Sequence, residues 1–108
     1  MNDMMIVETR DPHAVRDVEW TAGLLAAMRQ EGGRCTLMLA ENGVLGARDP
    51  ACPASLSRLA GAGVEILADR FALAERGITE AELASGITAA DLEVVIDRLV
   101  AGSNVIWR

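Results

Sequence analysis

The sequence predicts an α/β domain in which a five-stranded, mainly parallel sheet lies between two layers of helices, a three-layer α/β/α sandwich. Short apolar runs, typical of strands buried on both faces, recur along the chain, and segments with helical apolar spacing lie between them. Strands that alternate with helices through short connections form a parallel sheet with helices on both faces. At 108 residues, the chain is expected to form one domain over residues 1–108.

The first strand is predicted at Met4–Val7, and the first helix at residues 12–30. Asp11 is the expected N-cap, and Pro12 suits the first helical position because proline has no N–H to leave unpaired there. The paired glycines at 32–33 are expected to end this helix.

Two apolar stripes run along the first helix. The stripe expected to face the sheet contains Val15, Val18, Ala22 and Leu25. Trp20 and Leu24, with Ala27, fall on nearly the opposite side, where a helix of a one-domain protein should be polar. Trp20 and Leu24 are therefore predicted to lie in an oligomer interface.

The middle of the chain is expected to contain the next two strands. The Asn42-Gly43 dipeptide is typical of a turn and is expected to follow the second of the five strands. The predicted elements are a strand at 35–40, a loop or short helical turn at 45–52, a helix at 54–62, a strand at 64–67 and a short helix at 71–75.

The last third of the chain carries two possible capping boxes, a clear one at Thr79–Glu82 and a weaker one at Thr88–Asp91. Ile87 is expected in a short fourth strand, and residues 104–107 in the fifth. The helix between them is expected to end at Gly102 and to bury Leu92, Val95, Ile96 and Leu99.

Composition excludes several classes of function. The net charge of −6 argues against nucleic-acid binding, which needs a clustered basic surface. No apolar run approaches the roughly 20 residues that cross a bilayer. The first five residues do not resemble a signal peptide, so a cytoplasmic location is expected.

The motifs of common enzyme and metal sites are also missing from the sequence. With only Cys35, Cys52 and His13 as soft ligands, no metal site and no cofactor are expected. The sequence contains no GxSxG, P-loop or GxGxxG motif that would indicate a hydrolase, NTPase or dinucleotide-binding enzyme.

Four segments, in order along nearly the whole chain, resemble the DsrE/DsrF/DsrH family of sulfur-relay proteins, which includes TusB, TusC and TusD. They are Asn42-Gly43-Val44, Arg76-Gly77-Ile78, Gly86-Ile87-Thr88 and the final strand Asn104–Trp107. The resemblance implies a five-stranded parallel α/β/α sandwich, assembly into trimers or hexamers, and a role in passing persulfide sulfur between proteins.

The chain departs from this family at its functional position. Counting back from Arg76-Gly77, Asp69 stands where sulfur-carrying members have a cysteine, and Ala68 precedes it. Members without that cysteine are similar to the TusB/DsrH and TusC/DsrF subunits. The resemblance therefore implies a non-catalytic structural or docking subunit, in a homo-oligomer or in a complex with other sulfur-transfer proteins.

Three loops should meet at the carboxyl edge of the sheet, where open α/β folds bind ligands. Arg10 and Arg70 could hold an anion there, because capping does not need them, although solvated loop arginines are common. Asp11 and Asp69 could instead be helix caps. The predicted pocket or partner-binding residues are Arg10, Asp11, Glu41, Asn42, Gly43, Asp69 and Arg70.

A second reading gives the chain carrier activity through a relocated cysteine. Cys52 lies just before a predicted helix, whose N-terminus would favour a reactive thiolate, although an ordinary loop thiol is the simpler interpretation. Cys35 begins a buried strand and is expected in the core. His13 is expected to be a surface or capping residue. A third reading is a small-anion-binding module at the carboxyl edge of the sheet.

Overall fold

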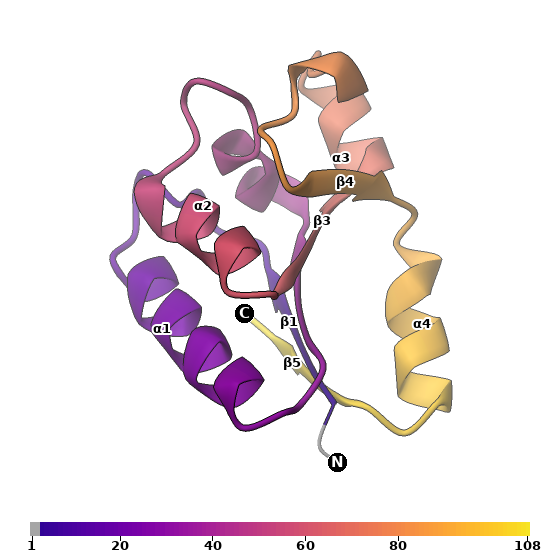
Figure 1. The fold of residues 1–108 in the computed structure, drawn as a ribbon. Coiled ribbons are helices and arrows are strands. Elements are labelled where there is room, and N and C mark those ends of the chain that lie inside the picture. Colours follow the sequence, from indigo (N-terminus) through magenta and orange to yellow (C-terminus); the bar gives the residue numbers. More distant parts are fainter. Residues whose placement is uncertain (1–2) are drawn as a thin grey trace.

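Five parallel strands form the central sheet, in the order β4-β3-β2-β1-β5 (Figure 1). The computed structural model describes residues 3–108. The prediction that the first five residues are not a signal peptide therefore concerns a segment whose first two residues lie outside the described range. The strands are β1 (Met4–Glu8), β2 (Cys35–Leu39), β3 (Glu65–Asp69), β4 (Ile87–Ala90) and β5 (Asn104–Trp107). The predicted fold class is confirmed, with all strand pairs parallel.

The helices form the two outer layers, with α1 and α2 on one side of the sheet and α4 on the other (Figure 1). The chain moves in one direction from β1 to β4 and then returns past β1 to β5. Because such crossovers are right-handed, the return places α4 on the opposite face. The helical segments are α1 (Asp17–Gln30), η1 (Glu41–Gly46), α2 (Ala54–Gly61), α3 (Arg70–Glu75), η2 (Glu80–Glu82) and α4 (Glu93–Val100).

The two sides of the sheet bury unequal cores. On the α1–α2 side, Val18, Ala22 and Leu25 are buried as predicted, within a large apolar cluster that also takes in α3. On the other side, the buried cluster within residues 3–108 is smaller and contains Met5, Val7, Met38, Ala40, Leu67 and Val95. The α4 layer is therefore held by little apolar contact.

Hydrogen bonds from an arginine of α4 add to this apolar contact between α4 and the sheet. Arg98 of α4 donates hydrogen bonds to Thr36 Oγ1 at 2.7 Å and to Glu65 Oε1 at 2.8 Å. Burial tends to raise the pKa of Glu65, but the hydrogen bonds from Arg98 and Thr36 outweigh it and lower the pKa. Arg98 thus ties the helix to the amino ends of β2 and β3.

The expectation that α4 buries four apolar residues is wrong for three of them. Leu92, Ile96 and Leu99 are 39%, 61% and 55% exposed, and only Val95 is buried. The apolar residues of this helix cover a wider arc than one helix can press against a sheet, since Val94, Val95 and Arg98 already occupy the inward side.

The start of α1 also differs from the prediction. The helix begins at Asp17 rather than Pro12, because residues 11–15 form a turn in which the Ala14 and Val15 amides donate to the Asp11 carbonyl. Of the two capping boxes, the one at Thr79–Glu82 is confirmed. The one at Thr88–Asp91 is wrong, because Thr88 lies in β4 and Leu92 is the N-cap of α4, with no capping side chain.

Candidate functional site

The carboxyl ends of β1 and β2 touch through their backbones. Gly43 is buried in η1, and a Cβ at this position would collide with the Glu8 carbonyl oxygen. That oxygen already accepts the Ala40 amide at 3.0 Å. Glu41, the first residue of η1, has a φ of 49° and an exposed side chain. A glycine at 43 thus allows the loops after β1 and β2 to lie together, as the sequence predicts for this edge.

Arg10 forms ion pairs with carboxylates of its own chain. Glu8 is completely buried, and its two carboxylate oxygens accept from Arg10 Nε at 2.9 Å and from a terminal guanidinium nitrogen at 3.0 Å. The other terminal nitrogen reaches Asp17 at 3.2 Å. The hydrogen bond with Glu8 raises the pKa of Arg10. These contacts occupy the guanidinium group of Arg10, which was predicted from the sequence as a group that could hold an anion.

Arg70 is occupied in a similar way on the other side of the edge. Its guanidinium donates to Asp91 at 2.8 Å, to Glu80 at 3.3 Å and to the Ala89 carbonyl at 3.3 Å. The hydrogen bonds with Asp91 and then Glu80 raise the pKa of Arg70. The structure therefore places Arg10 and Arg70 in two separate ion-pair clusters, each partnered within the chain.

Asn42 lies between these clusters and is also partnered. Its side-chain oxygen accepts from Arg76, which follows α3, at 2.9 Å. This hydrogen bond joins the loop after β2 to the end of α3.

Asp69 is the last residue of β3 and the cap of α3. Its side chain is almost completely buried, and Oδ2 accepts the Ala72 amide at 3.3 Å. Ala68, beside it, is completely buried. Of the two interpretations of Asp69 that the sequence allows, capping is the one with a hydrogen bond in the structure.

Asp69→Ala is expected to lower the free energy of unfolding by about 1 kcal/mol, because the α3 cap is lost. Asp69→Asn is the matched control, since an asparagine oxygen accepts the same amide, and it should change stability much less. Urea unfolding of the two variants measures the difference. Equal losses for alanine and asparagine would show that the carboxylate charge matters rather than the cap.

Asp11 and His13 form a second linked group at this edge. Asp11 Oδ1 accepts the His13 amide at 2.9 Å and lies 3.0 Å from His13 Nδ1, so Asp11 caps a turn and not the helix. The other ring nitrogen lies 2.7 Å from the Ala51 carbonyl oxygen. Both ring nitrogens face acceptors, and only a protonated imidazole can donate to both. The bond to Ala51 and the Asp11 carboxylate raise the pKa of His13.

The stability of the fold should therefore depend on the charge of His13. With a raised folded pKa, this contribution is fully present below the unfolded pKa of about 6.5 and is lost as pH rises through the folded pKa. Because the ring is exposed, we expect a difference below about 1 kcal/mol between wild type and His13→Asn, present at acidic pH and absent at alkaline pH. NMR titration of the single histidine, folded and in denaturant, gives both pKa values. A folded value at or below the unfolded one would contradict this.

Neither cysteine is in a setting that favours a thiolate. Burial raises the pKa of Cys52, whose Sγ lies 3.8 Å from Ser57 Oγ, and burial also raises the pKa of Cys35. Cys35 is in the core at the amino end of β2, as predicted. Among residues 3–108, no group of three or more histidine, cysteine or acidic side chains is placed to hold a metal ion.

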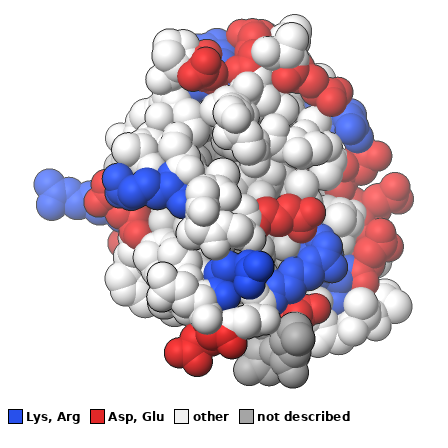
Figure 2. Space-filling model, viewed as in Figure 1, with Lys and Arg blue, Asp and Glu red and all other residues white. Residues whose placement is uncertain are grey.

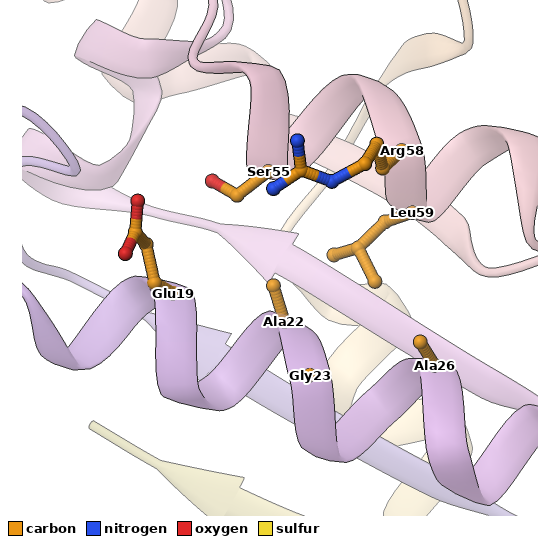
Figure 3. Close-up of a pocket in the computed structure, with 7 residues that line it drawn as sticks. All are labelled: Glu19, Ala22, Gly23, Ala26, Ser55, Arg58 and Leu59. Carbon is orange, nitrogen blue, oxygen red and sulfur yellow. The ribbon is translucent and has the colours of Figure 1, made fainter.

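Sequence reasoning missed a shallow pocket of about 290 Å³ between α1 and α2. Glu19 comes from α1, while Ser55 and Arg58 come from α2, and small residues of α1 form the floor (Figure 3). The small residues Ala22, Gly23 and Ala26 in one stripe were the available signal.

A larger groove of about 530 Å³ was also missed, along α4 and β5, and it is lined almost only by apolar side chains. The sequence feature that could have indicated this groove is the apolar arc of α4, which is unusually wide. Within the described part of the chain, no helix is both long and apolar enough to cross a membrane.

Comparison with known proteins gives a likeness in fold. No family model matches the chain, and no curated protein matches its sequence. The ychN protein from E. coli superposes over 100% of both chains, with a TM-score of 0.87 and 18% identity. MTH1491 from Methanobacterium thermoautotrophicum gives a TM-score of 0.80 at 21% identity, covering 99% of this chain and 98% of its own. BT1422 from Bacteroides thetaiotaomicron gives 0.76 at 16% identity, covering 98% and 95%.

The solved structures of MTH1491 and BT1422 are described as those of proteins of unknown function. The superposition on the ychN structure spans the whole of both chains. The chain, with its five parallel strands, therefore shares an α/β fold with these small proteins.

Proposed function

We propose that this chain is a non-catalytic, DsrE-like subunit that serves intracellular sulfur transfer by docking other proteins, in the cytoplasm. The observation that carries the proposal is Asp69, which is buried and caps α3 at the position that resembles the carrier-cysteine site. The match to the whole ychN fold supports the DsrE-like resemblance. Because the fold is that of the resembled family and a structural residue stands at the position of the carrier cysteine, we favour a partner role over a carrier role.

The two other readings have less support. A relocated carrier would need Cys52 as a thiolate, but burial raises the pKa of its thiol. An anion-binding module would need free guanidinium groups, but Arg10 and Arg70 donate to carboxylates of the chain. The ring of Phe71, two residues after Asp69, is 70% exposed and offers an apolar contact for a docking partner at the same edge.

Reconstitution with a cysteine-bearing DsrE-like protein from the same genome tests the proposal. The partner is loaded with persulfide and mixed with the chain, and complex formation is followed by size-exclusion chromatography. Intact-mass spectrometry then locates the sulfur. We expect a complex in which the sulfur stays on the partner, unchanged by Cys52→Ala and weakened at least tenfold by Phe71→Asp. The absence of a complex, or transfer of the sulfur to Cys52, would contradict the proposal.

A further inference from the structure

The outer edge of β5, one of the two edge strands of the sheet, is open. Within residues 3–108, β5 pairs with β1 alone. The Asn104 and Arg108 amides donate to carbonyl oxygens on the β1 side at 3.0 and 2.8 Å. Successive residues of a strand direct their backbone groups to opposite edges, so the N–H and C=O groups of Val105 and Trp107 point away from β1.

The opposite edge strand, β4, has its outward backbone groups occupied by the chain itself. The Ala89 carbonyl accepts from Arg70 at 3.3 Å, and the Ile87 amide donates to the Ala84 carbonyl at 3.1 Å. Native proteins protect sheet edges with covering contacts, charged side chains, proline or bulges. The four residues of β5 include no charged side chain and no proline. The edge of β5 therefore remains available to another strand.

On the α4 side of the sheet, the side chains next to this edge are apolar and exposed. Val105 and Trp107 point to that side, because their partners in β1, Met5 and Val7, belong to its buried cluster. Trp107 is 55% exposed and lines, with Ile96, the apolar groove of about 530 Å³. Neighbouring strands lie about 4.8 Å apart, so a strand added beside β5 would lay every second side chain against this groove.

The α1 side of the same edge is apolar as well. Ile106 points to this side, since its partner Ile6 belongs to the cluster under α1, and it is 42% exposed. Trp20 of α1 is 62% exposed, and Leu24, one turn later, is half-buried. The Trp20 ring lies near the end of β5, with its centre 5.5 Å from the Arg108 guanidinium. A single added strand would therefore cover apolar surface on both sides of the sheet.

The outer border of the groove is acidic. Glu93 and Asp97 are exposed and follow Leu92 and Ile96 by one position each, so they lie along the side of the apolar stripe of α4. The one arginine of this helix, Arg98, is turned toward the sheet. Figure 2 shows acidic side chains gathered along the edge of the molecule where α4 lies. Lysine or arginine in an added strand could lay its apolar stem on the groove and its charge beside this border.

We propose that the outer edge of β5 binds an extended segment of another protein as a sixth strand. The side chains of this segment that face α4 are apolar, with lysine or arginine at the ends, and those that face α1 are apolar. In complexes of this kind, main-chain hydrogen bonds provide affinity and alternate side chains provide specificity. A second copy of this chain fits less well, because its β5 carries no charge and its α4 brings further acidic residues to the border. The inference concerns a different surface from Asp69 and Phe71 and stands whether or not the chain serves sulfur transfer.

Fluorescence titration with the end-blocked peptide Arg-Val-Ile-Val-Ile-Val-Arg tests whether both sides of the edge are covered. In an extended strand, its arginines and isoleucines face one side and its valines the other. The chain has two tryptophans, Trp20 and Trp107, one beside each side of β5, so Trp20→Phe and Trp107→Phe each leave a single reporter. We expect the emission of both reporters to shift to shorter wavelength along the same binding curve. No binding, or a shift of Trp107 alone, would overturn the proposal.

Amide hydrogen exchange followed by NMR tests whether the peptide pairs with the strand edge. The Val105 and Trp107 amides should exchange at least tenfold more slowly in the complex, whereas the Asn104 amide, already bonded on the β1 side, should change much less. The same peptide N-methylated along its central residues keeps its side chains but cannot donate to β5, and it should bind at least tenfold more weakly. Equal binding of the two peptides would show that apolar contact alone holds them and would overturn the proposal.

Substitutions in the chain test the edge from the other partner. Val105→Pro removes an outward N–H without removing a hydrogen bond to β1, and it should weaken peptide binding at least tenfold. Val105→Ile, the matched control, keeps the donor and a β-branched apolar side chain, and it should bind like wild type. If Val105→Pro fails to fold by circular dichroism, the N-methylated peptide makes the same test. A folded Val105→Pro variant that binds like wild type would contradict pairing at this edge.

A charge exchange tests the kind of partner. Asp97→Arg should weaken binding of the arginine-ended peptide at least tenfold and strengthen binding of a matching peptide that ends in glutamate. Unchanged affinities would contradict a basic partner. Val105 and Trp107 amides that are already protected in the wild-type protein, through contact with a second copy, would overturn the proposal in favour of self-association.

Discussion

Arg10→Ala is expected to lower the free energy of unfolding by about 3 kcal/mol. The change leaves the carboxylate of Glu8, which is completely buried, without the guanidinium that binds both of its oxygens. Removing one partner of a buried ion pair costs far more than losing a surface pair, because the remaining charge stays desolvated. Chemical denaturation followed by circular dichroism measures the loss.

Two further variants isolate the cause of this loss. Arg58→Ala removes an exposed arginine of α2 and should change stability by less than about 0.5 kcal/mol. Glu8→Gln combined with Arg10→Ala should recover part of the loss, because a neutral amide is cheaper to bury than a carboxylate. An Arg10→Ala protein as stable as wild type, but unable to bind small anions, would instead establish Arg10 as a ligand-binding residue.

Gly43→Ala is expected to destabilise the protein by about 2–3 kcal/mol, as in other overpacked sites. The added Cβ would meet the Glu8 carbonyl oxygen, which is backbone and cannot rotate away. Relieving the collision would move the ends of β1 and β2 apart and stretch the Ala40–Glu8 hydrogen bond. Thermal and urea unfolding report this effect.

Gly23→Ala is the matched control for this substitution. Gly23 lies in α1, and an added Cβ would have no atom within 4 Å apart from its chain neighbours and the backbone of its own helix. Alanine in a helix is more favourable than glycine, so Gly23→Ala should stabilise the protein by about 0.5–1 kcal/mol. If both glycine variants shifted stability in the same direction, the close approach at Gly43 would not be the deciding feature.

Local patterns in the sequence predicted most of the fold. The first, second, third and fifth strands are near their expected places because each is a short apolar run between turn residues. Thr79 and Glu82 form the predicted capping box since both partners are three residues apart. The Asp11-Pro12 pair predicted the start of the first helix wrongly, because the Asp11 side chain accepts the His13 amide in a turn. The same two residues are compatible with a helix cap and with such a turn.

The candidate site was harder to predict, because its contacts join distant residues. Arg70 binds Asp91 across 21 positions, and Arg98 binds Thr36 across 62. Sequence spacing could place Arg10 and Arg70 at the correct edge of the sheet but could not show that carboxylates occupy both. Whether an apolar helix face is covered also depends on tertiary packing, which is why Ile96 and Leu99 of α4 were expected in the core.

The most direct test of the central claim, a DsrE-like subunit without carrier chemistry, is intact-mass spectrometry after exposure to a low-molecular-weight persulfide donor. Wild type and Cys52→Ala are compared before and after reduction. We predict no specific, reducible sulfur adduct on either protein, because burial raises the pKa of both thiols and Asp69 stands at the carrier position. A reducible adduct of one sulfur atom on wild type that is missing from Cys52→Ala would contradict the claim and make Cys52 a carrier.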